Sequence, residues 1–568
     1  MGGQAAVSAP VSTPVGEIDA VNRNAAAAMG CKMNQALYLG IDVGTLSARA
    51  GLFDAGGALL GAASAGFELR RPEHNHAVYR MDEIWAAVTR AVIECVAAAK
   101  AGGLDPHSRV AALAFDATSS LALRHVGARP LAGDADVFCW MDHRGEHEAE
   151  EITATGDRVL AYTGGTTSPE INLPKLLWLK RNDPAAFARV TAARDLVDEL
   201  GFRATGADTR SVCGLTCKWP YLPNDPEPWR HDLLARLGIA ELPGLAGAPR
   251  RPVAVGGLHG RLAPDVAHSF GLKAGLPVAA GLIDAEAGSL GVLGRDFRAR
   301  MNETVTIIGG TSTCFMAFAP DERAVPGVWG PFKDAVFPGF WLHEAGQSLS
   351  GAALDAVLVH HPGGPHSSSA EAHAQAAADV SALLGREGAS FAARRHIVPD
   401  WLGNRSPLGD GTVRAMASGI GEETTRRACL EAYYATARAL ALQARQVFDH
   451  LDRHGYALRK VALAGGHAKN PLLVQLYRDG LNRTLVLSDA PEPVLLGCAM
   501  VAACAGGAYG SLFAAVDAMS PPQRELQPDP RWRAAHARAY SIYLSMFALR
   551  NAIEGEARDA EAHRAAQD

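Results

Sequence analysis

A strand–turn–strand unit that occurs twice is the feature that most constrains the fold of this chain. Residues 36–53 (ALYLGIDVGTLSARAGLF) and 303–318 (ETVTIIGGTSTCFMAF) each place two apolar runs around a turn that contains Gly and Thr. Short apolar runs that flank such a turn are typical of a β-hairpin. Segments with helical periodicity, at 81–99 and 422–450, follow the two hairpins. The sequence therefore predicts two α/β domains that open with the same hairpin.

The length of the chain also requires more than one hydrophobic core. Single cores rarely grow beyond about 250–300 residues, and this chain has 568. We expect the domain boundary near 255–285 and draw it at residue 270, which gives an N-terminal domain over 36–270 and a C-terminal domain over 271–550. Residues 1–35 are rich in Ala, Ser and Pro and are expected to form a disordered extension, and 551–568 to form a flexible tail.

Charge and cysteine content exclude several functional classes. A formal net charge of −6 offers no basic surface for nucleic acid or for an anionic membrane, so any phosphate must be held by a local site. The nine cysteines are scattered without a CxxC motif, and we expect reduced thiols in a cytoplasmic protein. Cys213 and Cys217 have no histidine at zinc-finger spacing, so a structural zinc site is not expected there.

One uncharged stretch, residues 493–516, is long enough to span a bilayer. Ala and Gly dominate it, and Gly506, Gly507 and Gly510 interrupt it. These residues indicate a buried helix followed by a turn, and no membrane association is expected.

Both hairpin turns and a third Gly-rich turn are suited to phosphate. No GK[ST] motif of the Walker type is present, so phosphate binding needs another kind of loop. Gly lets the backbone approach a ligand, and exposed N–H groups in such turns bind phosphate oxygens. Residues 463–471 (LAGGHAKNP) run from a strand through a Gly turn into a helix, whose N-terminus suits a nucleotide. Asp42 ends the first strand and can hold a hydrated Mg²⁺ ion. An ordinary β-turn with a polar cap is the alternative for that segment.

These three turns, in their order and spacing, resemble the nucleotide site of the FGGY carbohydrate kinases. The segments WMDHR (140–144) and GNRSP (403–407) are similar to the family's WxDxR and GxRxP segments, and the resemblance extends over about 37–545. It implies an α/β fold of two actin/Hsp70-like (ribonuclease H-like) domains that flank a catalytic cleft. It also implies ATP and Mg²⁺ as cofactors and a small-molecule sugar or polyol as substrate. Two-fold dimers are the commonest assembly, so a homodimer is the default expectation.

The resemblance places the catalytic base at Asp284, within AGLIDAEAG (280–288). An acid that follows a strand end and opens an Ala-rich helix lies in the positive field of the helix N-terminus, which favours its ionised form. A simple helix cap is the alternative role. The metal ion falls on Asp42. The residues expected around phosphate and nucleotide are Gly44, Thr45, Ser47, Arg49, Gly310, Thr311, Gln347, Gly465, Gly466 and Asn470.

Three further segments indicate the sugar. FDATSS (115–120), TCKW (216–219) and EAGQS (344–348) most resemble the pentulose kinases of the family that act on D-ribulose or ribitol, and the expected product is the 5-phosphate. Lys218 and Glu344 can bracket sugar hydroxyls with a charged donor and a charged acceptor. The residues expected to contact the sugar are Asp116, Thr118, Ser119, Asp142, Lys218, Asp284 and Glu344.

Several alternatives stay open. L-ribulose or another pentulose can be the substrate. Two further hypotheses do not involve sugar phosphorylation: a sugar sensor, or a chaperone-like ATPase of the same superfold. The segment HRGEH (143–147) fits the HxxEH metalloprotease pattern, although a Gly lies inside the helix that this pattern needs. His467 stands where many relatives have a third Gly, and it can alter how adenine or ribose is held.

Overall fold

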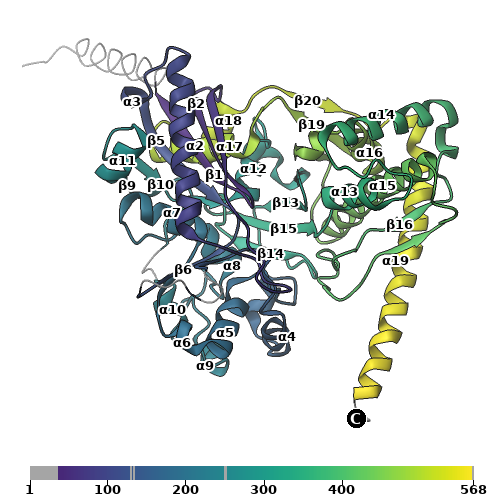
Figure 1. Cartoon of the computed structure of the whole chain (residues 1–568), viewed down its shortest axis with the longest axis horizontal. Helices are drawn as coiled ribbons and strands as arrows, with labels where there is room; N and C mark the ends of the chain where they lie inside the picture. Colours follow the sequence, from purple (N-terminus) through teal and green to yellow (C-terminus); the bar gives the residue numbers. More distant parts are fainter. Residues whose placement is uncertain (1–35, 128–130, 132–134, 248–251, 566–568) are drawn as a thin grey trace, which may run out of the picture.

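The computed structural model describes residues 36–565 apart from 128–130, 132–134 and 248–251 (Figure 1). The expected disordered extension, residues 1–35, lies outside the described residues.

A seven-stranded sheet forms the first half of the chain, in the order β3-β2-β1-β5-β10-β9 with β11 beside β5. Strands β1, β2 and β3 form an antiparallel meander, and β5 pairs with β1 in parallel. These strands are β1 (Leu37–Val43), β2 (Ser47–Asp54), β3 (Leu59–Gly66), β5 (Val110–Ala117), β9 (Leu258–Arg261), β10 (Pro277–Ala279) and β11 (Leu282–Ile283).

Strand β1 is buried along its whole length because helices cover both faces of the sheet. Leu39 and Ile41 face the core that includes α2 (Met81–Ala101), whereas Tyr38 shares a core with α17 (Pro493–Ala505). Side chains alternate along a strand, so Asp42 lies on the α17 side, as Tyr38 does. The parallel register places Asp116 of β5 directly beside Asp42.

A second seven-stranded sheet repeats this plan, in the order β14-β15-β13-β12-β18-β19-β20. Again two antiparallel pairs, β12–β13 and β13–β15, precede a strand, β18, that pairs with β12 in parallel. The prediction of two α/β domains that open with the same hairpin is confirmed. The strands are β12 (Thr304–Gly309), β13 (Thr313–Ala319), β14 (Trp329–Lys333), β15 (Trp341–Gln347), β18 (Lys460–Gly465), β19 (Thr484–Ser488) and β20 (Gln523–Leu526).

Helices from the second half pack on this sheet and against one another. The long helix α15 contacts α13, α14 and α16, and its buried residues belong to the largest hydrophobic core of this half. These helices are α13 (Gly351–His360), α14 (Ala370–Glu387), α15 (Arg426–Arg453) and α16 (Pro471–Gly480).

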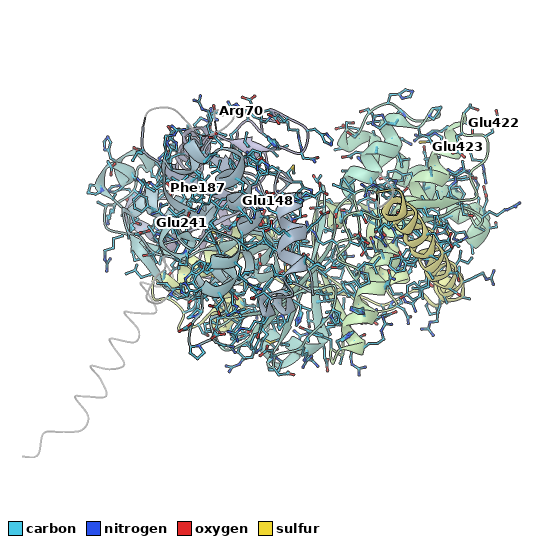
Figure 2. The ribbon with its side chains drawn as sticks, turned by 90° about the horizontal axis from the view of Figure 1, so that it is seen from below. Arg70, Glu148, Phe187, Glu241, Glu422 and Glu423 are labelled. Carbon is cyan, nitrogen blue, oxygen red and sulfur yellow. The ribbon has the colours of Figure 1, made fainter. Side chains whose placement is uncertain are left out.

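A smaller four-stranded sheet, in the order β4-β7-β6-β8, is inserted in the first half. Figure 2 shows Phe187 and Glu241 of this region at one end of the molecule, and Glu422 and Glu423, which precede α15, at the other. The elements of this region and its surroundings are β4 (Val78–Tyr79), β6 (Leu121–His125), β7 (Val137–Phe138), β8 (Val190–Asp195), α3 (Pro106–Arg109), α4 (Glu146–Ala154), α5 (Asn172–Asn182), α6 (Pro184–Phe187), α7 (Leu196–Thr205), α8 (Val212–Lys218), α9 (His231–Arg236), α10 (Leu242–Leu245) and α11 (Pro264–Phe270).

The chain does not divide at residue 270 as expected. Strands β10 and β11 follow that residue and complete the first sheet, and the second sheet begins only at Thr304. Helix α17 also returns from the second half to pack on β1 and β5, and α18 (Leu512–Met519) follows it. The two halves are therefore interleaved rather than consecutive.

The prediction of a flexible tail is also wrong over residues 551–565, which form the last part of a helix. Helix α19 (Pro530–Ala565) extends along the second half and beyond it (Figure 1). Ion pairs from Arg550 to Asp400 and from Arg558 to Asp410 attach it to the loop before β17 (Met416–Ser418), which pairs with β16 (His396–Val398).

The uncharged stretch at 493–516 forms a buried helix followed by a turn, as predicted. All residues of α17 from Leu495 to Ala503 are buried. None of the helices in the described part of the chain is both long and apolar enough to cross a membrane.

Close packing of α17 against α12 (Asp284–Leu290) depends on Gly497. A Cβ atom at this position would overlap the carbonyl oxygen of Ala287, a backbone atom that cannot rotate away. We expect Gly497→Ala to destabilise the protein by about 1–3 kcal/mol, as overpacking does in a tight core. Thermal unfolding followed by circular dichroism measures this loss.

Gly510→Ala is the matched control, because nothing lies within 4 Å of the added Cβ. This change should alter stability by less than about 0.5 kcal/mol. Equal melting temperatures for the two variants would contradict the close approach of α12 and α17.

Candidate active site

Asp284 is the first residue of α12, directly after strand β11, and is partly exposed. Its Oδ1 accepts a hydrogen bond of 2.8 Å from the backbone N–H of Ala285. Burial, followed by the negative charge of Asp42, raises the pKa of Asp284 to about 7. The N–H of Ala285 at the helix N-terminus favours the ionised form, as expected, but burial and the like charge of Asp42 outweigh it.

Asp42 and Asp116 lie side by side on the parallel strands β1 and β5. Both are buried, and Arg49 donates from Nε to Oδ2 of Asp42 over 2.6 Å. Among the described residues, Oδ1 of Asp42 and both carboxylate oxygens of Asp116 have no hydrogen-bond partner. Burial and the facing Asp42 raise the pKa of Asp116 well above its usual range.

This arrangement fits a bound cation. Arg49 pairs with Asp42 over 2.6 Å and with Glu492 over 3.0 Å, and it also interacts electrostatically with Asp116 and Asp284. Unpartnered buried carboxylate oxygens require a proton or a positive charge. Mg²⁺ prefers carboxylate oxygens and its own water molecules, so Asp42 and Asp116 are suitable groups to hold hydrated Mg²⁺.

The three Gly-rich turns lie at corresponding ends of strands. The turn after β1 is closed by a hydrogen bond from Gly44 N–H to Ser47 O, and that after β12 by one from Gly310 N–H to Ser312 O. In the third turn, Gly465 has φ of +80°, and a Cβ there would overlap the carbonyl oxygen of Gly309. Only Gly fits this position because both the dihedral angle and the contact exclude a side chain.

A cavity of about 430 Å³ lies between the second and third of these turns and the start of α16. Gly310, Thr311, Gly466 and Asn470, four of the predicted nucleotide residues, line it. Apolar side chains such as Leu354 and Leu473 complete its walls. Asn470 caps α16, because its Oδ1 accepts from the N–H groups of Leu472 and Leu473. The cavity therefore combines an apolar wall with a helix N-terminus, which suits a nucleoside phosphate.

Gln347 does not line this cavity, contrary to expectation. It is buried, and its Nε2 donates to Leu440 O and to Gln443 Oε1, each over 2.9 Å. These hydrogen bonds connect β15 to α15.

His467 does line the cavity, and its Nδ1 lies 3.1 Å from the hydroxyl of Tyr477. Burial lowers the pKa of His467 to about 4, so it is neutral near pH 7.

Two ion pairs join the halves of the chain close to Asp284. Lys218 of α8 lies 3.4 Å from Glu344 of β15, and both side chains are buried. Arg405 binds both carboxylate oxygens of Glu170, over 3.0 and 2.7 Å. The negative charge of Glu344 also contributes to the raised pKa of Asp284, so this pair and the predicted base interact electrostatically. Donors and acceptors of both charges are therefore available beside Asp284.

Aromatic rings flank these ion pairs. The guanidinium of Arg405 lies 5.3 Å from the ring centre of Trp329 and 5.9 Å from that of Trp140, and Lys218 lies 4.6 Å from Trp329. Glu170, Arg405 and Trp329 were not predicted as site residues. Arg405 could have been found because it lies in the GNRSP segment, whereas the sequence around Glu170 carries no comparable signal.

Asp142 does not point into this site. It is fully buried and binds Arg144 over 2.7 Å, and its Oδ2 accepts from the N–H of Ala77. Its prediction as a sugar contact is replaced by a structural role. Thr118 is also held internally, since its hydroxyl lies 2.9 Å from that of Ser120, whereas Ser119 is partly exposed.

The HxxEH pattern does not form a metalloprotease helix. Helix α4 begins at Glu146, so His143 lies outside it.

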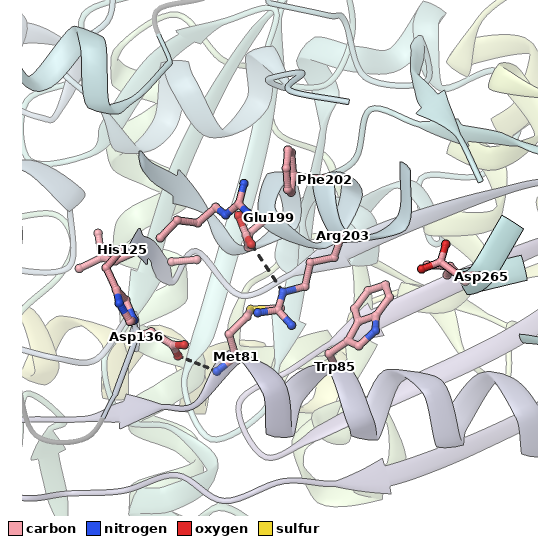
Figure 3. A pocket seen from close by; sticks show the side chains of 12 residues that line it. Met81, Trp85, His125, Asp136, Glu199, Phe202, Arg203 and Asp265 are labelled. Carbon is pink, nitrogen blue, oxygen red and sulfur yellow. Dashed lines mark hydrogen bonds and ion pairs between the residues drawn. The ribbon is translucent and has the colours of Figure 1, made fainter. Parts of the chain in front are cut away.

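A separate cavity of about 400 Å³ opens between α2 and α7 (Figure 3). It contains none of the predicted site residues, and several of its polar groups are paired, as Met81 N–H is with Asp136 and Arg203 with Glu199.

Comparisons with known proteins identify the family of the chain. The N-terminal domain of the FGGY family of carbohydrate kinases matches residues 37–291, and the C-terminal domain matches residues 305–506. A human FGGY carbohydrate kinase domain-containing protein is 34% identical over 90% of this chain and 96% of its own length. A D-ribulokinase of Saccharomyces cerevisiae is 31% identical over 82% of this chain and 72% of its own length.

Solved structures share the fold. A xylulose kinase from Rhodospirillum rubrum superposes with a TM-score of 0.70 at 21% identity, over 91% of this chain and 99% of its own. The family models that match both halves of the chain define a carbohydrate kinase, which is a phosphotransferase. The chain belongs to the FGGY family of carbohydrate kinases.

The buried Asp142–Arg144 pair gives a test of the structural role of Asp142. Asp142→Asn leaves the guanidinium of Arg144 buried without a counter-charge, and loss of one partner of a buried pair costs about 3–5 kcal/mol. We expect a clearly lower melting temperature by differential scanning calorimetry.

Glu241→Gln is the control, since it removes one partner of the exposed Lys180–Glu241 pair. It should cost less than about 1 kcal/mol. Unchanged thermal stability of Asp142→Asn together with a raised KM for sugar would contradict the structural role and support Asp142 as a sugar contact.

Proposed function

We propose that the chain transfers the γ-phosphoryl group of ATP, with Mg²⁺, to a terminal primary hydroxyl of a pentulose or pentitol. D-Ribulose or ribitol, converted to its 5-phosphate, is the foremost substrate. The observation that carries this proposal is that Asp284 interacts electrostatically with Asp42 and Arg49 and also with Glu344, the partner of Lys218 in the pair that joins the two halves.

Asp284 suits the role of general base. With a pKa of about 7, about half of this carboxyl is ionised at neutral pH, and the ionised form can accept a proton from a hydroxyl group. The N–H of Ala285 holds one carboxylate oxygen, which leaves the other available for the substrate. Phosphoryl transfer depends mainly on positioning and on charge stabilisation, so a fixed carboxylate of moderate strength is sufficient.

Charge stabilisation at the phosphates would come from the turns and from Arg49. The backbone N–H groups of Thr45 and Thr311 belong to the two hairpin turns, and the cavity beside Gly466 is large enough for a nucleoside. Asp42 and Asp116 would hold the magnesium ion, whose charge when bound offsets that on the transferring phosphoryl oxygens.

The ion pairs beside Asp284 favour a neutral polyhydroxylated substrate. Lys218 and Arg405 offer donors, and Glu344 and Glu170 offer acceptors, so each hydroxyl can find a partner of either kind. Such a site rejects analogues that lack a hydroxyl because its own buried charges would be left unpaired. The similarity to a D-ribulokinase supports D-ribulose among the pentuloses. L-Ribulose or another pentulose is the alternative substrate.

A substrate panel tests this proposal. ADP release with Mg-ATP is measured against D-ribulose, L-ribulose, D- and L-xylulose, ribitol, arabinitol, glycerol and no sugar. We expect the highest kcat/KM for D-ribulose or ribitol. In Asp284→Asn, kcat should fall by about 10²–10⁴-fold, the usual contribution of a general base.

Asp232→Asn is the control for that variant. Asp232 is also an acid in the first turn of a short helix, α9, but it is exposed. Its replacement should leave kcat unchanged. ATP turnover that is independent of sugar and survives in Asp284→Asn would refute the kinase assignment and favour a chaperone-like ATPase.

The raised pKa of Asp284 also predicts a pH dependence. Only the ionised carboxylate can accept the hydroxyl proton, so kcat/KM should fall as the pH decreases below about 7. Because the charge of Asp42 raises this pKa, Asp42→Asn should move the acidic limb to lower pH while it lowers activity. Initial rates from pH 5 to 9 measure both effects. A wild-type limb near pH 4, or a limb that Asp42→Asn does not move, would contradict this role.

A further inference from the structure

Two cysteines and a glutamate lie close together on the two helices that carry Lys218 and Asp284. Cys213 and Cys217 lie one turn apart on α8 and therefore project from the same face of the helix. Glu286, in the first turn of α12, faces them, with its Oε1 4.0 Å from Sγ of Cys217. The two sulfur atoms and a carboxylate oxygen all lie within 4.8 Å of one another. Across the described ranges, this is the one group of three such ligands so closely spaced.

The carboxyl group of Glu286 in this cluster is buried and only partly hydrogen-bonded. Glu286 is fully buried, and its Oε2 has no hydrogen-bond partner within the part of the chain that the structure describes. Cys213 and Cys217 are 0% and 2% exposed, so water does not reach the sulfur atoms freely. A buried carboxylate of this kind must be protonated or must bind a cation.

We infer that Cys213, Cys217 and Glu286 form a binding site for a thiophilic divalent cation, Zn²⁺ in the first place. Thiolate sulfur selects zinc over magnesium or calcium, and zinc accepts carboxylate oxygen as a further ligand. Around one tetrahedral Zn²⁺, sulfur and oxygen ligands lie roughly 3.5 Å apart, which follows from bond lengths of about 2.3 and 2.0 Å. The present Sγ–Oε1 separation of 4.0 Å therefore requires a small inward rotation of side chains.

Charge and protons balance at this site. Binding releases the two thiol protons, and the carboxyl proton where Glu286 carries one, and it forms two Zn–S bonds and one Zn–O bond without any change of oxidation state. Three anionic ligands and one dication leave a net charge of −1. Lys218 follows Cys217 directly and interacts electrostatically with Glu286 as well as with its partner Glu344, so its ammonium group reduces the cost of this negative charge. Three protein ligands leave a fourth coordination position, which one enclosed water molecule would fill.

The ion would lie beside the candidate active site and would act on its structure, without taking part in phosphoryl transfer. It joins α8, which ends at Lys218, to α12, which begins at Asp284. The ion would hold these two helices at a fixed separation. Sequence spacing argued against zinc here because the third ligand, Glu286, is 69 residues from Cys217 and meets it only in the folded chain.

Zinc content of the intact protein tests this inference and needs neither sugar nor ATP, so it is independent of the proposed kinase activity. The full chain is expressed in zinc-supplemented medium, so that the site can fill during folding, and is purified without chelator. We expect about one zinc per chain by inductively coupled plasma mass spectrometry, as for a structural site. Cys213→Ser/Cys217→Ser should contain less than a tenth of that amount, and Glu286→Gln should lose zinc on dialysis at least 10-fold faster than the wild type.

Cys95→Ser/Cys429→Ser is the matched control, because these two cysteines are equally buried but lie in other cores. Its zinc content should equal that of the wild type. Should the serine variant of the site fail to fold, cadmium-substituted wild type gives a second readout, since the ¹¹³Cd chemical shift reports the number of thiolate ligands. Wild-type protein with less than a tenth of a zinc per chain, or a cadmium shift without two sulfur ligands, would overturn the inference.

Discussion

The contact between α17, α12 and the first sheet is the constraint on which the candidate site depends. Gly40 of β1 and Gly497 of α17 have no side chains, and a Cβ at either position would collide with a backbone carbonyl across the interface, that of Leu495 or of Ala287. The helix can therefore lie directly on β1 and β5, with α12 against its other side. Strands and helix that approach so closely carry Asp42, Asp116 and Asp284 into one small volume.

That packing explains the electrostatics of the site. A helix N-terminus typically favours a carboxylate by up to about 1 kcal/mol at an ordinary position. A pKa raised from 3.8 to about 7 corresponds to roughly 4 kcal/mol in the opposite direction. Burial and the charge of Asp42 therefore decide the proton affinity of Asp284, and the helix only moderates it. A group that must accept a proton near neutral pH benefits from this balance.

The sequence predicts the parts of this structure that depend on local pattern. The paired hairpins, the three Gly-rich turns, the buried helix at 493–505 and the residues at strand ends are all marked by residues close together in the chain. It fails where a partner is distant in the chain. Asp142 accepts a hydrogen bond from the N–H of Ala77, 65 residues away, and Gln347 donates to Leu440 of α15, 93 residues away. Glu170 becomes visible only through Arg405, which lies 235 residues away. Long-range pairing of polar groups leaves no periodic signal, so it could not be derived from one sequence.

Two ion pairs, of which the sequence predicted the residues of only one, join the two halves of the chain at the site. Lys218 and Glu170 belong to the first half, and Glu344 and Arg405 to the second. A polyhydroxylated substrate that binds between these charges would replace the contacts between the two halves with hydrogen bonds from its own hydroxyl groups to each half. Its binding free energy would therefore depend on how closely the halves approach. Closure of the halves would also exclude water, the competing acceptor for the phosphoryl group. In this arrangement, recognition of the sugar and protection of the transferred group follow from the same contacts.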